Sequence, residues 1–402
     1  MTKEQTFFLQ MLKDHLYQRK TQVPEGLDWK LLCAYANYHN LGAVCFCQCR
    51  EYLLQHPELK DANDSLVNAF HASVYHAALL EQNYASVCEA FQAAAIPFIP
   101  IKGILIAPWY PEPALRTMGD IDLLVRPEDR ERIRSVMEAL GFRNLRWSEQ
   151  EWDYQSGDCK FELQSVLLHE KASENQALRS KLNDFWSYTR KDDDTGLLTL
   201  DWNMHLLYLI AHIAKHIRKS GIGFRQFFDI AVLLQRNPEV FSWERIQADA
   251  DSMQFGSFTR SCLTLCEKWF DVPSPLSAAP ISSELLENIT EKVFRNGLFG
   301  FQNTDSRYSD LAKEREHSPR VPLFLLKLRV TRKLLFPSYR NLCTLTKYEG
   351  LRGKPYLLPW YWSKRILRGF RDQKTERLTS KVLNVQESAL SDFSQDLKEL
   401  GL

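Results

Sequence analysis

The run from Gly119 to Val125, Gly-Asp-Ile-Asp-Leu-Leu-Val, constrains the fold more than any other part of the sequence. Its first apolar residues alternate with Asp120 and Asp122 in the period of two that is typical of a β-strand. Alternation places one set of side chains against a hydrophobic core and both carboxylates together on the opposite face. We therefore expect a strand that presents two acids side by side.

Further strand patterns surround this run. They are expected at 96–101, 142–146, 152–155 and 159–167, with a Ser-Gly-Asp turn before the last. A helix should follow Pro127, which suits the first helical position, and end near Leu140, because Gly141 suits a helix C-terminus. Strands and one helix joined by short connections predict an α+β fold, with a small mixed sheet flanked by helices.

Helical patterns occupy both sides of this sheet. Apolar residues recur at three- and four-residue steps over 5–92, and a long helix is expected at about 64–94. Asp201 is the expected N-cap of a helix over 201–216, and another helix should cover 225–235. The remainder should be mostly helical, with loops at 271–281 and 302–320. We expect three regions: helical 1–94, the sheet domain 95–200, and helical 201–402.

Composition limits the classes of protein that the chain can belong to. Its 402 residues are 45% hydrophobic, with a formal net charge of +1, so overall charge indicates no particular partner. The N-terminus lacks a secretory pattern, and no transmembrane segment is expected. Nine scattered cysteines, an odd number, favour reduced thiols in a cytosolic protein. We expect a cytoplasmic location, with peripheral contact with a membrane surface as an alternative.

The acids of the first strand predict a metal site. Asp120 and Asp122 offer hard oxygen ligands of the kind that Mg²⁺ prefers, with Mn²⁺ as a substitute. Glu162 is the best third acid, because it alternates with apolar residues on a neighbouring strand. Asp158 and Glu170 are weaker candidates because they fall in turns or at strand ends. We therefore expect Asp120, Asp122 and Glu162 to be both metal ligands and catalytic residues.

Cations and backbone donors near these acids predict a phosphate site. Lys102 and Gly103 directly follow the first strand, where glycine permits close approach of a ligand to the backbone. Arg116 precedes Asp120 by four residues, and its planar guanidinium suits a pair of phosphate oxygens. With Gly119, these residues form the expected binding site for a nucleotide.

Together these residues resemble the bacterial family of uncharacterised nucleotidyltransferases, within the superfamily of DNA polymerase β and the minimal nucleotidyltransferases. The likeness rests on Ile-Pro-Ile-Lys-Gly at 99–103, Tyr110-Pro, Arg116, the 119–125 strand, Gly141-Phe142, the Glu162 strand, 205–216, 225–234 and, more weakly, 335–338.

The resemblance implies transfer of a nucleoside monophosphate from an NTP to an acceptor hydroxyl, with release of pyrophosphate. Asp120, Asp122 and Glu162 would hold two metal ions. The sequence departs from the usual pattern in two places: Lys102-Gly103 stands where the superfamily places Gly-Ser, and Leu-Gln-Ser follows Glu162. The acceptor, whether protein, sugar, nucleic acid or small molecule, is not implied.

Two features of the 201–235 region have structural and functional interpretations. His212 and His216 share one helix face, with His205 seven residues before His212. Packed or hydrogen-bonded core histidines are the plainer interpretation, and contact with the nucleotide or a catalytic carboxylate is the alternative. Asp229 lies four residues after Arg225, which predicts an ion pair on one helix face. The alternative, which rests on the family resemblance in this segment, is a non-catalytic role of Asp229 next to the active cleft.

Residues 320–371 are strongly basic. They contain thirteen lysines and arginines and a single acid, Glu349, with aromatic residues interleaved. This composition fits a solvated basic face, a surface for an anionic polymer, or a helix at 357–370 that lies on a membrane surface. Two further functions stay open for the chain. One is an inactive nucleotide sensor or partner subunit, for which the departures at Lys102-Gly103 and after Glu162 leave room, and the other is a nucleic-acid-binding scaffold that uses 320–371.

Overall fold

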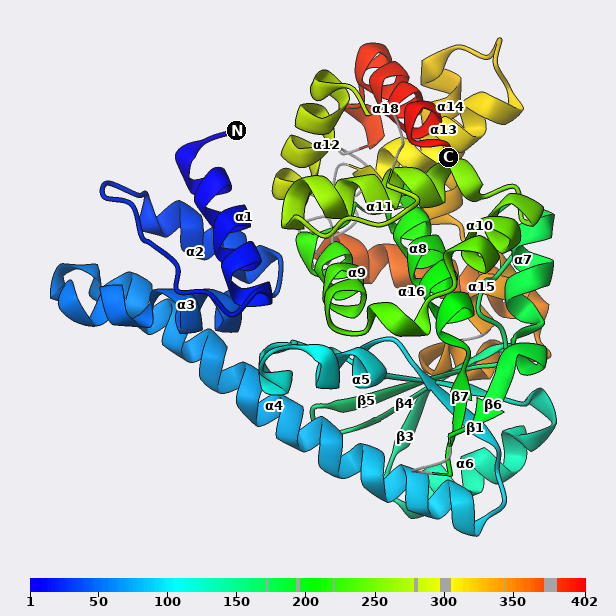
Figure 1. Cartoon of the computed structure of the whole chain (residues 1–402). Coiled ribbons are helices and arrows are strands. Elements are labelled where there is room, and N and C mark those ends of the chain that lie inside the picture. The colour runs from blue at the N-terminus through cyan, green and yellow to red at the C-terminus, as the bar shows by residue number, and fades with distance from the viewer. Residues whose placement is uncertain are drawn as a thin grey trace.

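The computed structural model has an α+β architecture in which one mixed sheet lies among helices (Figure 1). It describes residues 1–170, 173–192, 196–219, 221–277, 281–296, 305–343, 345–371 and 382–402. Parts of the two expected loops, 278–280 and 302–304, and of the tail, 372–381, lie outside this description. The predicted fold class is confirmed.

The sheet has five strands in the order β1-β2-β5-β4-β3. The strands are β1 (Phe98–Ile101), β2 (Ile121–Val125), β3 (Arg143–Trp147), β4 (Glu151–Ser156) and β5 (Cys159–Gln164). β2 and β5 are parallel, and the other neighbours are antiparallel. The chain leaves β2 through α6 (Arg130–Ala139) and the β3–β4 hairpin before β5 returns beside β2. This crossover places two strands with acids next to each other.

Helices cover both faces of the sheet. On one face, α4 (Lys60–Ala93) and α6 pack on the apolar residues of β2 and β5, so Phe91 and Ile133 contact the same core as Ile121 and Phe161. Figure 1 shows α4 running along the sheet from the N-terminal helices. Residues of the opposite face, such as Leu124, join a larger helical core. All five residues of β2 are therefore buried.

The larger core joins helices that come before the sheet in the sequence with helices that come after it. It combines α1 (Lys3–Leu16), α2 (Trp29–Tyr38) and α3 (Gly42–Gln55) with α8 (Trp202–Lys219), α9 (Phe224–Arg236), α11 (Gly256–Phe270) and α12 (Ser283–Asn296). Phe8 packs against Phe224 and Phe294, with ring centroids 6.0 and 5.7 Å away. Residues before and after the sheet thus share one hydrophobic interior.

The remaining elements are mostly helices. They are α5 (Gly103–Ile106), α7 (Gln176–Asn183), β6 (Thr189–Lys191), β7 (Leu198–Leu200), α10 (Trp243–Ser252), α13 (Asp305–His317), α14 (Leu323–Leu335), α15 (Tyr339–Cys343), α16 (Leu358–Arg371) and α18 (Glu387–Leu400). The loop expected at 302–320 is wrong, since α13 lies there. Among the α13 residues whose burial is described, 310–317, Leu311 and Ala312 are the buried ones, and they share a core with α14 and α18. Two neighbouring buried residues make no apolar period along this stretch.

Several local predictions are confirmed. Asp201 accepts hydrogen bonds from the backbone of Asn203 and Met204 at the start of α8, and Gly141 adopts a φ of +83° after α6. All nine cysteines are free thiols. In the described part of the chain, every helix is too short or too polar to cross a lipid bilayer.

His39 makes folding stability sensitive to acid. It is fully buried, and its Nδ1 accepts a hydrogen bond of 3.3 Å from the backbone N–H of Phe224. Burial lowers the pKa of His39 from 6.5 to about 3. The unfolded chain therefore takes up this proton first as the pH falls. The stabilisation is complete above about pH 6.5 and is lost progressively toward pH 3.

We expect His39→Asn to flatten this dependence, because the asparagine Oδ1 replaces the acceptor without titrating. Below about pH 6, the free energy of unfolding of the natural protein should fall by about 1.4 kcal/mol per pH unit more than that of the variant. Urea unfolding at a series of pH values measures the difference. Parallel pH profiles for the two proteins would contradict the prediction.

Candidate active site

A cavity of about 500 Å³ lies between the sheet and helices α8 and α9. Its walls come from the start of α5, the loop before β2, β2 itself, β5 and the two helices. Every site residue expected from the sequence lines it: Lys102, Gly103, Arg116, Gly119, Asp120, Asp122 and Glu162. Residues separated by up to 60 positions in the chain thus converge on one space.

Three carboxylates face this cavity from two neighbouring strands. Asp122 of β2 lies directly opposite Glu162 of β5 in the parallel register, and Asp120 immediately precedes β2. Their side chains are 6%, 23% and 38% exposed for Asp122, Glu162 and Asp120 respectively. Asp122 is more buried than a residue on an open sheet face, because helices cover that face.

Two lysines contact these carboxylates. Lys102 Nζ donates a hydrogen bond of 2.6 Å to Asp122 Oδ1. Lys160 Nζ lies 3.7 Å from Asp120 Oδ2 and 3.9 Å from Glu162 Oε2. As the side chains stand, the described residues contain no cluster of three His, Cys, Asp or Glu side chains with the geometry of a metal site. Ammonium groups supply the positive charge beside the acids.

Lys160 and its third partner, Asp153, were missed in the sequence. Asp153 of β4 lies opposite Glu162, and its Oδ2 is 3.5 Å from Lys160 Nζ. Lys160 precedes Glu162 by two residues on β5, so the period of two that selected Glu162 also placed Lys160 on the same face. Asp153 required the β4–β5 register, which the sequence does not show.

Burial and neighbouring charges shift the pKa values of Asp122 and Lys102. Burial raises the pKa of Asp122 from 3.8 to about 7, with Asp120 and Glu162 adding to the rise and Lys102 opposing it. Burial acts against the charge of Lys102, but the pKa of its ammonium is raised well above 10.5, chiefly by Asp122. The site therefore favours positive charge next to Asp122, here the Lys102 ammonium.

The backbone of Lys102 is strained and held by α8. Its φ of +55° and ψ of −125° are rare for a residue with a side chain, and cost on the order of 1–3 kcal/mol. Its backbone N–H donates a hydrogen bond of 3.1 Å to Nε2 of the buried His205. Burial lowers the pKa of His205 to about 3, so the ring is neutral and Nε2 accepts. His205 thus fixes the residue that contacts Asp122.

Arg116 forms a buried ion pair instead of projecting freely into the cavity. Its Nη2 and Nε donate hydrogen bonds of 2.8 and 3.1 Å to the two carboxylate oxygens of Asp229 on α9. Tyr110 Oη donates to the same carboxylate at 2.7 Å. The expected Arg225–Asp229 pair is wrong, since Arg225 Nη1 donates to the carbonyl of Thr117. Asp229 is thus paired with Arg116, which is distant in the sequence, and not with Arg225, its neighbour on the same helix.

His212 and His216 of α8 also line the cavity. Their Nε2 atoms are 3.2 Å apart, so one ring donates and the other accepts. Burial, followed by the charge of Lys102, lowers the pKa of His212 well below 6.5. The plainer interpretation made from the sequence is therefore confirmed, since the rings are hydrogen-bonded to each other. Their place at the wall of the acid-lined space leaves contact with the nucleotide or a catalytic carboxylate as a prediction.

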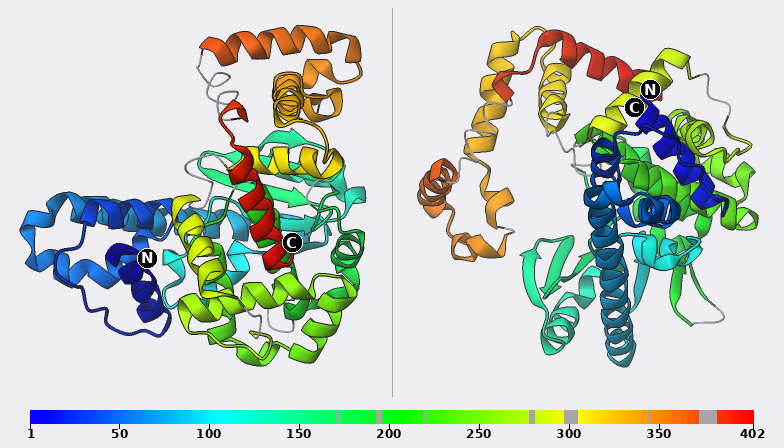
Figure 2. Two further views of the ribbon diagram at one scale, coloured as in Figure 1. Left: turned by 90° about the horizontal axis from the view of Figure 1, so that it is seen from above. Right: turned by 90° about the vertical axis from the view of Figure 1, so that its left-hand side faces the viewer.

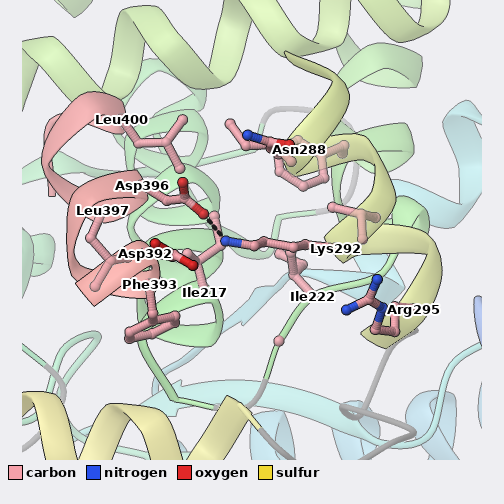
Figure 3. A pocket seen from close by; sticks show the side chains of 14 residues that line it. Ile217, Ile222, Asn288, Lys292, Arg295, Asp392, Phe393, Asp396, Leu397 and Leu400 are labelled. Carbon is pink, nitrogen blue, oxygen red and sulfur yellow. Dashed lines mark hydrogen bonds and ion pairs between the residues drawn. The ribbon is translucent and has the colours of Figure 1, made fainter. Parts of the chain in front are cut away.

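A second cavity of about 350 Å³ lies between α8, α12 and α18 (Figure 3). Its walls are mostly apolar, and Lys292 and Asp396 form an ion pair across it (Figure 3). It contains none of the residues expected to bind a metal or a phosphate. The acid-lined cavity is therefore the candidate active site.

Gly103 fits only without a side chain. A Cβ at this position would lie 2.3 Å from Arg116 Nη1 and 2.8 Å from Met118 Sδ, whereas a Cβ at Gly119 would meet no atom within 4 Å. Arg116 cannot move without loss of its paired geometry with Asp229.

We expect Gly103→Ala to destabilise the fold by about 1–3 kcal/mol through overpacking, with Gly119→Ala as the matched control that has little effect. Denaturant unfolding of both variants and the natural protein measures this. Equal stability of the two variants would show that the space around Gly103 is not tight.

Comparison with known proteins identifies the family of the chain. No curated protein and no solved structure matches the chain. A family model described as "Uncharacterised nucleotidyltransferase" matches residues 25–271, which is more than half of the chain and includes every residue that lines the acid cavity. The chain therefore belongs to this family of nucleotidyltransferases, and it is a transferase.

Proposed function

We propose that the protein transfers a nucleoside monophosphate from an NTP to an acceptor hydroxyl in a reaction that depends on Mg²⁺, and that the acid-lined cavity is its active site. The main supporting observation is the parallel register that sets Asp122 beside Glu162, with Asp120 next to them, at one cavity wall. Phosphoryl transfer needs mainly positioning and neutralisation of charge, which such a cluster provides.

The carboxylate ligands of the cavity suit two metal ions, as in the polymerase-β-like superfamily. Carboxylate oxygens are hard ligands, and the raised pKa of Asp122 reflects the demand of this buried site for positive charge. Asp120, Asp122 and Glu162 would hold the ions, and the Lys102 and Lys160 ammonium groups would move away from the oxygens that they contact. Bound Mg²⁺ would stabilise negative charge on the attacking and leaving oxygens.

The proposed reaction forms one bond and breaks one. The acceptor oxygen bonds to the α-phosphorus while the bond between this phosphorus and the bridging oxygen to the β-phosphate breaks, and pyrophosphate leaves. The acceptor proton passes to Glu162 or to a water. Although burial opposes it, Lys102, Lys160 and Lys215 lower the pKa of Glu162, so this group is an ionised carboxylate at neutral pH.

The cations of the cavity would bind the triphosphate. Lys102 is held at a defined place by its backbone and His205, so its ammonium can exchange Asp122 for a phosphate oxygen. Arg116 lines the cavity, but its Nε and Nη2 already donate hydrogen bonds to Asp229. Because Asp229 balances its charge, we propose that Arg116 contributes chiefly by fixing the loop before β2, with phosphate contact through the remaining Nη1.

The first experiment is incubation with each of the four NTPs, labelled at the α-phosphate, with Mg²⁺ or Mn²⁺ and a cell extract as the source of acceptor. Pyrophosphate release and transfer of label are measured. We expect Asp122→Asn and Glu162→Gln to lower the transfer rate by on the order of 10²–10⁴-fold, since each removes a charged group from the transition state.

Asp158→Asn is the matched control, because Asp158 is an exposed acid at the β4–β5 turn that does not line the cavity. It should transfer label at the natural rate. Full activity of folded Asp122→Asn would exclude the proposed mechanism. Tight nucleotide binding with no pyrophosphate under any condition would instead identify a nucleotide sensor.

Metal binding should depend on pH. Because burial raises the pKa of Asp122 to about 7, its proton competes with a metal ion at and below this pH. We expect the affinity for Mn²⁺, measured by titration calorimetry, to fall as the pH is lowered from about 8 to 6, by up to about tenfold per pH unit below pH 7. Asp122→Asn should bind weakly at every pH. An affinity that does not change over this range would contradict a role for Asp122 as ligand.

A further inference from the structure

The segment from α14 to α16, residues 323–371, exposes an unusual set of apolar side chains. We call it the basic arm. Figure 2 shows α14 and α16 as an outer layer along one side of the molecule. Among the described residues, thirteen large hydrophobic side chains are exposed, and seven belong to the arm: Phe324, Leu325, Leu328, Phe336, Tyr356, Trp360 and Leu367. Such clustering marks an interaction surface.

Packing within the arm does not account for these side chains. The inner face of α16 is already anchored: Trp362 Nε1 donates to the carbonyl of Pro337 at 2.9 Å, and Tyr361 packs edge-on against Tyr348. Trp360 and Leu367 lie at helical spacing on the outer face of α16, and they are 59% and 70% exposed. In α14, Leu326 and Val330 pack in the core with α13, while Phe324 and Leu328 are exposed.

Cations accompany the exposed apolar residues. Lys364 and Arg368 lie on the same outer face of α16, and Lys364 Nζ is 5.0 Å from the centre of the Trp360 ring. Arg332 is exposed on α14. In the described part of the chain, none of these three cations has a carboxylate partner. Glu314 of α13 pairs with Arg329 and Lys333 of the arm, but Glu349 is the one acid within 320–371, so cations remain in excess. The surface is therefore complementary to a layer of negative charge.

From these observations we infer that the basic arm binds the surface of an anionic lipid bilayer. At the boundary between headgroups and acyl chains, leucine and phenylalanine side chains enter the hydrocarbon, tryptophan lies at the interface, and lysine and arginine reach the phosphates. Nucleic acid would use the cations and aromatic rings, but it offers no apolar environment for exposed Leu325, Leu328 and Leu367. The aliphatic residues therefore favour lipid over nucleic acid.

The arm is joined to the sheet domain. Leu345 forms a β-bridge with Arg146 of β3, at the edge of the sheet. Attachment to a bilayer through the arm would hold the sheet and its acid-lined cavity close to the membrane surface. The inference does not rest on the proposed reaction, and either can fail without the other.

The experiment is cosedimentation of the full chain with vesicles of phosphatidylcholine alone or of phosphatidylcholine with phosphatidylglycerol. We expect binding to the anionic vesicles, weakened by salt because the attraction to headgroups is screened. Lys364→Ala/Arg368→Ala should weaken binding by about 25-fold, at about fivefold per cation. Leu367→Glu should weaken it by at least about tenfold.

Leu54→Glu is the matched control, because Leu54 is 78% exposed on α3 and lies outside the arm. It should bind vesicles as the natural protein does, and circular dichroism checks that all variants are folded. Failure to bind anionic vesicles would overturn the inference. Equal binding by Leu367→Glu and Leu54→Glu, or tight RNA binding without vesicle binding, would also overturn it and would indicate a polyanion surface.

Discussion

The buried ion pair between Arg116 and Asp229 connects the two halves of the active-site cavity. Both side chains are only 6% exposed, and burial of either charge alone would cost several kcal/mol. The loop that leads into β2 is therefore bound to α9, with Tyr110 as a further donor. This attachment determines where β2 begins and so where Asp120 lies. It also explains the glycine at 103, since the Arg116 guanidinium occupies the space that a side chain would need.

Charge balance inside the cavity depends on groups from distant parts of the chain. Asp122 meets Lys102 from the end of β1, while Lys160 on β5 lies among Asp120, Asp153 and Glu162. Lys102 reaches Asp122 from a strained backbone that His205 holds in place. Local strain of this kind persists where the surrounding structure fixes it, and it is frequent at functional sites. The proposed nucleotide site thus has its cations placed before any ligand binds.

Much of the fold and the site could be predicted because the signals were local. Alternation identified β2 and the pair Asp120 and Asp122, and the expected site residues do line one cavity, although their roles remain proposals. The failures share a cause. Arg225 was paired with Asp229 because they are neighbours on a helix, but a distant arginine took the position. α13 was missed because its buried residues, Leu311 and Ala312, pack in a core with α14 and α18 that no local pattern indicates.

The sequence by itself determined the α+β class, the paired acids of one strand and the family, because period-two alternation and motif spacing depend only on neighbouring residues. The tertiary structure alone decided which strand lies beside β2, how deeply Asp122 is buried and which cations face it. These properties depend on the crossover that makes β2 and β5 parallel and on the helices that cover the sheet. Burial and long-range charge pairs arise only when the whole chain is packed, so no local pattern contains them.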